Sequence, residues 1–454
     1  MRRKCNRIMI AGMKSGSGKT TLTCGVLQLL VNRGLSVASL KCGPDYIDPA
    51  FHEKVLGVRS GNLDGYFFED EVLSSLLSKH GQNKDITVIE GVMGYYDGLG
   101  MKSIGGSFHV SMATKTPVVL VIDCKGMAES IGAILHGFLT YRPNQIRGVI
   151  FNRLPAQLYE PLKEVAENMG ICVLGYVPTL KEFQLESRHL GLVTADEIHD
   201  IKNKIEGLAL KLAETIDIDG LLELAGKAPE LPAYQQRSNQ EQQVNKKIRI
   251  AVAKDEAFCF IYQDNINLLE ELGCEIMYFS PLHDKSIPTE ADGMLLYGGY
   301  PELYAKQLSS NQSMITSIRE AIKNGLPTIA ECGGFMYLHE WIEDREGNRY
   351  PMAAVLEGGC YKTNRLQRFG YVELEAAVDN LLCKKGDKIK AHEFHYWDSE
   401  HTGDGFVAQK PFKQINWKCA YATKTLYAGY PHIHFYANTN VARQFVEACR
   451  TENV

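Results

Sequence analysis

The sequence predicts an α/β protein with two α/β domains, each built around a mainly parallel sheet. Two observations support this fold class. In the first half, short apolar runs rich in β-branched residues alternate with segments of helical period, as in parallel sheets covered on both faces. The same alternation starts again near residue 248, after a segment that is rich in glutamine and poor in apolar residues.

Six strands are expected in the first half, because six apolar runs each have the length of a buried strand. They cover residues 7–12, 36–41, 86–90, 117–123, 146–151 and 171–176. The clearest helix begins at Lys19 and places Leu22, Val26, Leu29 and Leu30 on one face.

The predicted domain boundaries follow from these changes in pattern. The first domain is expected at residues 1–225, a linker at 226–247 and the second domain at 248–454. In the second domain, strands at 248–253 and 275–279 flank a helix at 261–272.

The bulk composition excludes several classes of protein. The formal net charge is −5, and the lysines and arginines are dispersed, so no nucleic-acid partner is expected. The longest apolar runs, such as 118–122, have the length of a strand and cannot span a bilayer, so no membrane partner is expected either. Twelve cysteines are scattered without a Cys-x-x-Cys pair, which is typical of a reducing compartment and predicts a cytoplasmic enzyme.

A glycine-rich segment follows the first predicted strand. Residues 12–21 read Gly-Met-Lys-Ser-Gly-Ser-Gly-Lys-Thr-Thr, one residue longer than the usual phosphate-loop spacing. Glycines let backbone N–H groups converge on a phosphate, Lys19 adds a positive charge, and the hydroxyl of Thr20 can bind Mg²⁺. A flexible hinge is the alternative, but the order strand, loop, helix favours a nucleotide site. The nucleotide-binding residues are expected to be Gly12, Lys14, Ser15, Gly16, Ser17, Gly18, Lys19, Thr20 and Thr21.

Polar residues follow three other predicted strands of the first domain. Glu90 ends one strand and is a candidate ligand of Mg²⁺ beside the phosphate loop, with a capping or surface role as the alternative. The acidic loop 41–49 is held by two prolines and would face the ligand crevice of a parallel sheet, although it also fits a plain turn. Asn152 ends another strand, where it can bind a base edge or form a turn.

The strongest chemical candidate in the second domain is Cys332. It lies between a predicted strand and a helical segment, where a thiol is exposed on a tight turn and a helix N-terminus lowers its pKa. Ala330 replaces the first glycine of the Gly-x-Cys-x-Gly motif, so a buried structural cysteine is the alternative.

Two further segments favour an active thiol. The glycine pair 298–299 follows an earlier strand and can offer an oxyanion donor. His432 and His434 lie on one face of a late segment, and one of them is a candidate general base. Two histidines alone do not make a metal site, because a third ligand would have to come from elsewhere.

These motifs resemble class I, or triad, glutamine amidotransferase domains. Together with the phosphate-loop domain, the chain from about residue 7 to 440 resembles the family of cobyrinic acid a,c-diamide synthases. The resemblance rests on residues 41–49, 188–192, 255–258, 298–302, 330–334 and 392–396. It implies a P-loop ATPase-like domain followed by a flavodoxin-like amidotransferase domain.

The resemblance also implies roles for the residues of the second domain. Cys332 would be the nucleophile that attacks the glutamine amide, and His432 its base. Gly299 and Gly333 would supply the oxyanion donors. The third catalytic member stays open, because His434 stands where such domains often carry a glutamate.

In the first domain, the resemblance implies that Lys19 and Thr20 bind ATP with Mg²⁺ and that Asn152 binds adenine. The implied neighbours of the substrate carboxylate are Tyr46, Asp48 and Asp97, and the implied ligands of Mg²⁺ are Thr20, Glu90 and Asp48.

The phosphate loop itself resembles those of dethiobiotin synthetase and of the cell-division and partitioning ATPases. Lys14 stands where the partitioning ATPases carry a lysine that acts across a dimer. A homodimer is therefore one option for this chain, and the sequence leaves its oligomeric state open.

The implied reaction is an ATP-dependent, glutamine-hydrolysing amidation of the a and c carboxylates of cobyrinic acid. ATP would convert a carboxylate into an acyl phosphate, and the thiol would release ammonia from glutamine for transfer between the domains. The substrates would be small molecules: ATP, glutamine and a corrinoid acid. Alternatives are the same amidation of hydrogenobyrinic acid or nickel-sirohydrochlorin, a ligase for another acid such as a cell-wall lipid, and a partitioning-type ATPase with a non-catalytic binding domain.

Overall fold

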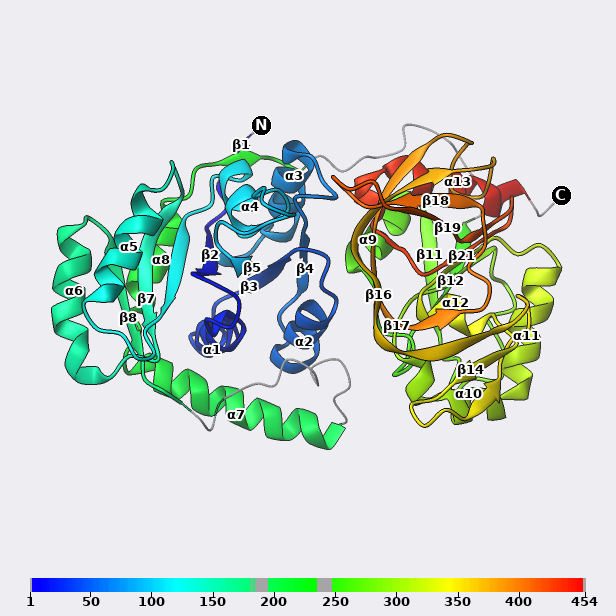
Figure 1. Ribbon diagram of the computed structural model, residues 1–454, viewed down its shortest axis with the longest axis horizontal. Helices are drawn as coiled ribbons and strands as arrows, with labels where there is room; N and C mark the ends of the chain where they lie inside the picture. Colours follow the sequence, from blue (N-terminus) through cyan, green and yellow to red (C-terminus); the bar gives the residue numbers. More distant parts are fainter. Residues whose placement is uncertain (1, 181–182, 184–194, 235–246, 452–454) are drawn as a thin grey trace. The chain divides into compact units, whose positions relative to one another are not determined.

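The computed structural model describes residues 2–180, 183, 195–234 and 247–451, and the chain divides into two compact units, Met1–Gln235 and Gln236–Val454 (Figure 1). Each unit is an α/β domain with its own sheet, which confirms the predicted fold class. Within the described residues, no helix combines the length and the apolar character needed to cross a bilayer.

The first unit contains a seven-stranded, wholly parallel sheet in the order β4-β3-β5-β2-β6-β7-β8. Its strands are β2 (Arg7–Gly12), β3 (Val37–Cys42), β4 (Ser60–Leu63), β5 (Ile86–Gly94), β6 (Val118–Asp123), β7 (Ile146–Asn152) and β8 (Cys172–Val177). Six of them match the predicted strands. The sequence does not predict β4, because Ser-Gly-Asn-Leu contains no apolar run. The chain order of the strands reverses at β2, so the loop after β2 lies where open α/β sheets bind ligands.

Helices cover both faces of this sheet, which explains why most of its strands are apolar runs. The helices α1 (Lys19–Asn32), α2 (Ile47–Leu56), α7 (Ala195–Ala213) and α8 (Ile218–Gly226) share one apolar cluster with the strands. Right-handed crossovers place α3 (Asp70–His80), α4 (Ser107–Ala113), α5 (Ser130–Thr140) and α6 (Tyr159–Asn168) on the opposite face.

The start of the predicted linker packs on the first unit. The strand β1 (Arg2–Arg3) pairs antiparallel with β9 (Leu231–Pro232). The buried guanidinium of Arg7 donates a hydrogen bond to the carbonyl oxygen of Pro229 at 2.8 Å, and the side chain of Leu231 is buried. Residues 228–232 therefore belong structurally to the first unit, and the remaining linker residues 235–246 lie outside the described part of the chain.

The second unit contains a six-stranded sheet in the order β11-β10-β12-β13-β21-β20. The strands β10 (Ile248–Ala253), β11 (Cys274–Phe279), β12 (Gly293–Leu296), β13 (Thr328–Glu331) and β21 (Leu426–Gly429) are parallel and follow the flavodoxin-like order, while β20 (Tyr421–Ala422) is antiparallel. Its helices are α9 (Gln263–Glu271), α10 (Ala305–Ser310), α11 (Gln312–Lys323), α12 (Gly333–Tyr337) and α13 (Thr439–Thr451).

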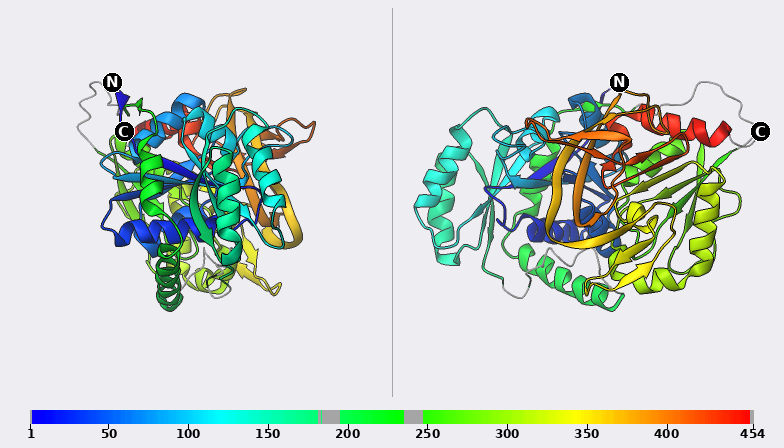
Figure 2. Two further views of the ribbon diagram at one scale, coloured as in Figure 1. Left: turned by 90° about the vertical axis from the view of Figure 1, so that its left-hand side faces the viewer. Right: turned by 45° about the vertical axis from the view of Figure 1, so that its right-hand side comes forward.

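A second, largely antiparallel sheet in this unit is not part of the sequence prediction. Most of it lies between β13 and β21 in the chain and consists of β14 (Trp341–Glu343), β15 (Arg349–Pro351), β16 (Gly359–Ala376), β17 (Lys388–Ser399), β18 (Phe406–Gln409), β19 (Asn416–Cys419) and the later β22 (His432–Ile433). The long strands β16 and β17, yellow and orange in Figure 2, bend along their length, and their pairing shifts register twice. Because β22 pairs with β17, this sheet fixes the backbone that carries His432.

Candidate active sites

The loop between β2 and α1 has the backbone geometry of a phosphate site. Gly16 and Gly18 have φ angles of +74° and +85°, in the left-handed region that favours glycine. A Cβ atom on Gly18 would lie 2.3 Å from Nδ2 of Asn152, so a larger residue does not fit there. Ser15 is exposed at the turn of the loop, whereas the buried hydroxyl of Ser17 donates a hydrogen bond to the carbonyl oxygen of Lys14 at 2.8 Å. The buried side chain of Ser17 thus stabilises the loop, and the turn at Ser15 is exposed to solvent.

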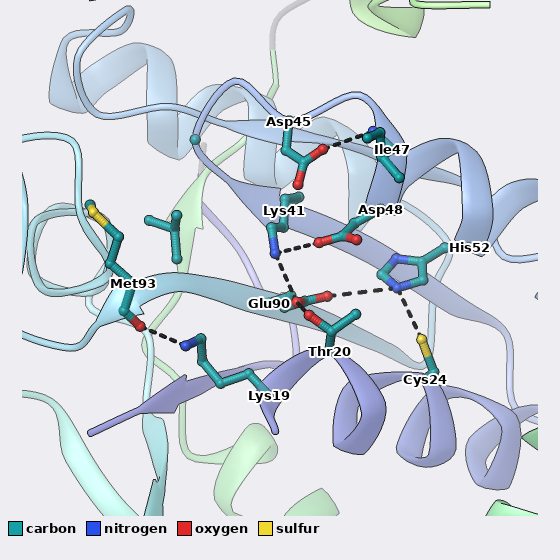
Figure 3. Close-up of polar contacts among 12 residues, drawn as sticks. Lys19, Thr20, Cys24, Lys41, Asp45, Ile47, Asp48, His52, Glu90 and Met93 are labelled. Atoms are coloured by element: carbon teal, nitrogen blue, oxygen red, sulfur yellow. Dashed lines mark hydrogen bonds and ion pairs between the residues drawn. The ribbon is translucent and has the colours of Figure 1, made fainter. Parts of the chain in front are cut away.

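Lys19 begins α1 and folds back over this loop. Its ammonium donates a hydrogen bond to the carbonyl oxygen of Met93 at 2.6 Å (Figure 3). It donates another to the carbonyl oxygen of Lys14 at 3.2 Å. The stem of the side chain passes Gly12, where a Cβ atom would approach it to 3.0 Å. Burial, and secondly the charge of Lys41, lower the pKa of Lys19 to about 8. Among the described residues, the hydrogen bonds of this partly desolvated cation go to backbone carbonyl groups, which suits the predicted role of Lys19 as a phosphate ligand.

A buried polar network lies beside the loop (Figure 3). Oε1 of Glu90, on β5, accepts hydrogen bonds from the hydroxyl of Thr20 at 2.6 Å and from Nζ of Lys41 at 2.7 Å. The same ammonium lies 2.5 Å from Oδ2 of Asp48. Burial raises the pKa of Glu90 to about 7. Burial alone would lower the pKa of Lys41, but the carboxylates of Glu90 and Asp48 raise it above its ordinary value.

The residues assigned to the substrate come from two loops. Asp48 and Tyr46 lie at the start of α2, after β3, and Asp97 follows β5. Oδ2 of Asp97 accepts the backbone N–H of Gly94 at 3.0 Å, and the charge of Asp97 acts on Lys19. Both loops follow the carboxyl ends of neighbouring strands, so these acids share one edge of the sheet with the phosphate loop.

A cavity of about 260 Å³ opens next to the phosphate loop. Its polar wall includes Thr21 and Asn152, and apolar side chains of β8 and α7, such as Val177 and Leu208, form the other wall. Nδ2 of Asn152 donates a hydrogen bond to the carbonyl oxygen of Ser17 at 2.8 Å. Asn152 therefore braces the loop, besides lining a cavity whose chemistry suits a nucleobase.

Asp123, at the end of β6, joins two cations to the same loop. Its Oδ2 lies 3.2 Å from Nζ of Lys14 and 2.6 Å from Nη2 of Arg153, whose guanidinium also donates to the carbonyl oxygen of Gly16 at 2.9 Å. Lys14 is thus paired inside its own chain. Arg153 holds the outer turn of the loop from a backbone conformation with φ of +57°.

Replacing Asp123 by asparagine is expected to weaken ATP binding by about tenfold, because the loop loses its brace of charge-assisted hydrogen bonds. Replacing Lys14 by alanine is the matched control. Its side chain is 58% exposed, and an exposed ion pair is worth about 1 kcal/mol or less, so about a fivefold loss is the upper limit. Isothermal titration with ATP measures both changes. A loss in Lys14→Ala that exceeds the loss in Asp123→Asn would instead assign Lys14 to the nucleotide itself.

In the second unit, Cys332 occupies a strained turn between β13 and α12. Its backbone has φ of +48° and ψ of −103°, and its N–H donates to the carbonyl oxygen of Gly429 at 2.8 Å. The turn agrees with the predicted strand-to-helix position of a nucleophile. The predicted lowering of the thiol pKa by the helix N-terminus is present but is outweighed by burial. Burial raises the pKa of Cys332 well above its ordinary value, and the N–H of Gly333 opposes that rise only in part.

Three glycines close around this thiol. A Cβ atom on Gly298 would lie 2.6 Å from Cε1 of His432 and 3.4 Å from Cβ of Cys332, so the side chains of the predicted base and nucleophile flank a space that glycine leaves open. A Cβ atom on Gly333 would lie 3.0 Å from the backbone nitrogen of Gly299. The backbones of Gly299 and Gly333 thus meet beside the thiol, as two oxyanion donors must.

The two late histidines have different surroundings. Nδ1 of His432 lies 3.5 Å from Oε2 of Glu331, and both side chains are buried. Burial, and secondly the charge of His395, lower the pKa of His432 to about 3. Nδ1 of His434 instead accepts the backbone N–H of Tyr436 at 3.3 Å. The structure therefore brings His432 against the carboxyl group of Glu331.

The two units match known families separately. Residues 8–193 match the CobQ/CobB/MinD/ParA nucleotide-binding domain, and residues 249–440 match the CobB/CobQ-like glutamine amidotransferase domain. The cobyrinate a,c-diamide synthase of Caldanaerobacter subterraneus subsp. tengcongensis is 41% identical over 98% of each chain. The chain belongs to the cobyrinate a,c-diamide synthase family. Further relatives under the same name are 40% identical, in Listeria innocua, and 37% identical, in Thermoplasma volcanium, each over 98% of this chain.

Membership of the cobyrinate a,c-diamide synthase family assigns one partial reaction to each unit. The chain is an ATP-dependent carbon–nitrogen ligase with glutamine as its nitrogen donor. This confirms the predicted enzyme class and the resemblance on which it rested. A partitioning-type ATPase with a non-catalytic second domain is not supported, because relatives of the same name match both units.

Sequence reasoning about this family member missed three polar residues of the two sites. Lys41 is a charged residue near the end of an apolar strand, before a Gly-Pro-Asp turn. That position could have indicated that its side chain belongs to a site at the edge of the sheet. Arg153 directly follows Asn152, and Glu331 directly precedes Cys332. Nothing in the local pattern shows which distant groups they contact, because their partners lie on other strands and loops.

Replacing Glu302 by glutamine is expected to stabilise the second unit at about pH 8 but not at about pH 5. Glu302 lies in the short helix η3 (Pro301–Leu303), and burial raises its pKa to about 7. The folded unit then keeps a proton that the unfolded chain releases from about pH 4.5 upward, so this group lowers stability as pH rises through 7. Urea unfolding followed by tryptophan fluorescence reports on this unit, which contains all three tryptophans. An equal gain at both pH values would contradict the prediction.

Proposed function

We propose that this ligase amidates the a and c carboxylates of cobyrinic acid, in two ATP- and glutamine-dependent steps. The observation that carries the proposal is the match over nearly the whole chain to relatives of that name, with a phosphate-loop site in one unit and a thiol site in the other. Hydrogenobyrinic acid and nickel-sirohydrochlorin remain the competing substrates.

In the first unit, a substrate carboxylate attacks the γ-phosphorus of ATP, and ADP leaves. The ammonium of Lys19 neutralises charge on the phosphate that is transferred. Ammonia then attacks the acyl carbon and inorganic phosphate leaves, so one carboxylate becomes one amide for each ATP. The neighbouring acids Asp48 and Asp97, with Tyr46, form the proposed edge of the carboxylate site. Thr21 and Asn152 line the cavity next to the phosphate loop, which supports the proposal that they bind the nucleoside part of ATP.

Mg²⁺ is the proposed cofactor of this step. The residues beside the loop fit it, since the hydroxyl of Thr20 and the carboxyl groups of Glu90 and Asp48 are hard oxygen ligands, and Mg²⁺ in such sites takes one or two carboxylates plus phosphate oxygens. Oε2 of Glu90 is also buried without a hydrogen-bond partner among the described residues. When bound, Mg²⁺ supplies charge neutralisation on the phosphates. The chain's own Lys41 already bridges Glu90 and Asp48.

In the second unit, the thiol of Cys332 attacks the side-chain amide of glutamine. His432 takes the thiol proton and returns it to the leaving nitrogen, so ammonia departs and a thioester remains. The N–H groups of Gly299 and Gly333 stabilise the oxyanion. Water then hydrolyses the thioester to glutamate and frees the thiol.

A panel of tetrapyrrole acids tests the substrate. Full-length enzyme is incubated with each tetrapyrrole acid, ATP, Mg²⁺ and glutamine, and the product masses are measured by mass spectrometry. Two successive mass changes of one amidation each on cobyrinic acid are expected. Amidation of hydrogenobyrinic acid or nickel-sirohydrochlorin, with cobyrinic acid left unchanged, would replace the proposal.

We also propose that the enzyme acts in the cytoplasm on small molecules alone, without a nucleic-acid partner. All twelve cysteines are free thiols, as expected in a reducing compartment, and the net charge is −5. A homodimer stays a prediction, and the pairing of Lys14 with Asp123 of its own chain gives it no support.

A further inference from the structure

The third member of the thiol site is missing from its expected place. Two residues after His432 stands His434, whose ring lies 4.6 Å from that of Tyr262 and whose Nδ1 accepts the N–H of Tyr436. These contacts tie His434 to the turn that starts the short helix η4 (Phe435–Ala437). That nitrogen caps a turn and is not directed at the ring of His432.

A carboxyl group reaches His432 from another strand. Glu331 is the last residue of β13, next to Cys332, and its Oε2 lies 3.5 Å from Nδ1 of His432. Its Oε1 accepts the backbone N–H of Ile433 at 3.2 Å. One side chain therefore contacts the histidine ring and the backbone beside it, which fixes both in relation to the nucleophile.

We propose that Glu331 is the positioning carboxyl group of the thiol site, in place of the glutamate that His434 replaces. It holds His432 in the tautomer with its proton on Nδ1, which leaves Nε2 free to accept the proton of Cys332. This inference rests on the proposed roles of Cys332 and His432.

The chemistry needs a carboxylate at this point. When Sγ of Cys332 bonds to the amide carbon, its proton moves to Nε2 of His432, and the ring becomes an imidazolium whose Nδ1–H faces Glu331. Burial raises the pKa of Glu331 to about 8 in the free enzyme, and an imidazolium opposite it favours the ionised carboxylate, which then stabilises that cation. The separation of 3.5 Å is long for a hydrogen bond, and catalytic hydrogen bonds of free enzymes often shorten only when substrate binds.

The nearest rival is Glu393 on β17. Its Oε2 already pairs with Nε2 of His395 at 3.2 Å, and that ring stacks on Tyr430 with a centroid distance of 3.7 Å. Oε2 of Glu393 is therefore already paired with His395, although the charge of Glu393 also acts on His432. The titratable groups around the Glu331–His432 pair are His392, which is opposite His432 in the β17–β22 pairing, together with Glu393, His395, Tyr297, Tyr427 and Cys332 itself.

Glutamine hydrolysis by full-length variants tests the proposal. Glu331→Gln is expected to lower kcat for ammonia release by about 10²-fold, because general base catalysis loses its support, with KM for glutamine unchanged. Ammonia-dependent amidation should stay at the wild-type level. His434→Gln and Glu393→Gln are the matched controls, and each should retain more of the kcat than Glu331→Gln.

Alkylation of Cys332 by iodoacetamide, followed peptide by peptide across the pH range, separates positioning from mere folding. Loss of the carboxyl group removes the partner of the imidazolium, which should raise the apparent thiol pKa by more than the lost repulsion between Glu331 and the thiolate lowers it. Alkylation should therefore slow near neutral pH but not in strong alkali. A misfolded site would change the rate at every pH. The proposal is overturned by a wild-type alkylation profile in Glu331→Gln, or by a kcat loss that appears in His434→Gln or Glu393→Gln and not in Glu331→Gln.

Two further variants cover the remaining outcomes. If Glu331→Gln does not fold, by tryptophan fluorescence, Glu331→Asp takes its place. It keeps the charge but shortens the reach, and a wild-type kcat in that variant would overturn the proposal. Full glutaminase activity in Cys332→Ser would defeat the thiol site itself, whereas activity in Glu331→Gln alone would defeat only the role of Glu331.

Discussion

Replacing Cys332 by serine is expected to abolish glutamine-dependent amidation and to leave ammonia-dependent amidation unchanged. A serine hydroxyl is a far weaker nucleophile than a thiolate, and loss of a catalytic nucleophile costs on the order of 10⁴-fold or more. The phosphate-loop unit keeps all its residues, so it can still activate the carboxylate when ammonia is supplied. Amide formation with either nitrogen donor is measured by mass spectrometry on the same enzyme preparation.

The matched control for this variant is Cys274→Ser. Cys274 lies on β11 in the same unit and is as buried as Cys332, each with an exposed fraction of 5%. It therefore reports the cost of placing a hydroxyl in this core without touching the strained turn. If a folded Cys332→Ser protein lost amidation activity equally with glutamine and with ammonia, the assignment of ammonia release to the second unit and carboxylate activation to the first would be contradicted.

Replacing Lys19 by glutamine is expected to lower amidation with glutamine and amidation with free ammonia to the same extent. Lys19 is a buried cation beside the phosphate loop and the proposed ligand of the phosphate, and loss of one such charged donor typically costs about 10²–10³-fold. Lys163→Gln is the control, because that lysine is on α6, away from the loop, in a surface pair with Glu167. A Lys19→Gln enzyme that amidates normally with free ammonia would remove the phosphate loop from the mechanism.

The same lysine predicts a pH dependence for ATP binding. Because burial lowers the pKa of Lys19 to about 8, its charge is present below that pH and is lost above it. ATP affinity should therefore fall as the pH rises above 8, and the fall should be absent in Lys19→Gln. Titration calorimetry at a series of pH values measures this, and a flat wild-type profile would contradict it.

Much of the fold could be predicted because most strands of the parallel sheets are buried on both faces and read as apolar runs. The six predicted strands of the first unit and the strand before Cys332 are examples. The short strand β4 and the antiparallel sheet escape that reasoning. β4 has a polar sequence, and the register of β16 against β17 depends on two irregularities that no local pattern encodes.

The candidate sites divide in the same way. The phosphate loop and the turn at Cys332 are local motifs, so sequence alone locates them. The contacts of Lys41 with Glu90, of Arg153 with Asp123 and of Glu331 with His432 join residues far apart in the chain. Whether a charged side chain is paired depends on the packing of neighbouring strands, and that information exists only in the assembled sheet.

The backbone conformation of Cys332 lowers the stability of the fold while it places the thiol that the proposed glutamine hydrolysis requires. A non-glycine residue at φ of +48° and ψ of −103° carries strain on the order of 1–3 kcal/mol, whereas glycine would accept that geometry freely. A library selected only for heat resistance should therefore enrich glycine at position 332. The selected variants would be more stable proteins that cannot use glutamine. A glycine at this position in a natural relative would indicate an enzyme that takes its nitrogen from free ammonia.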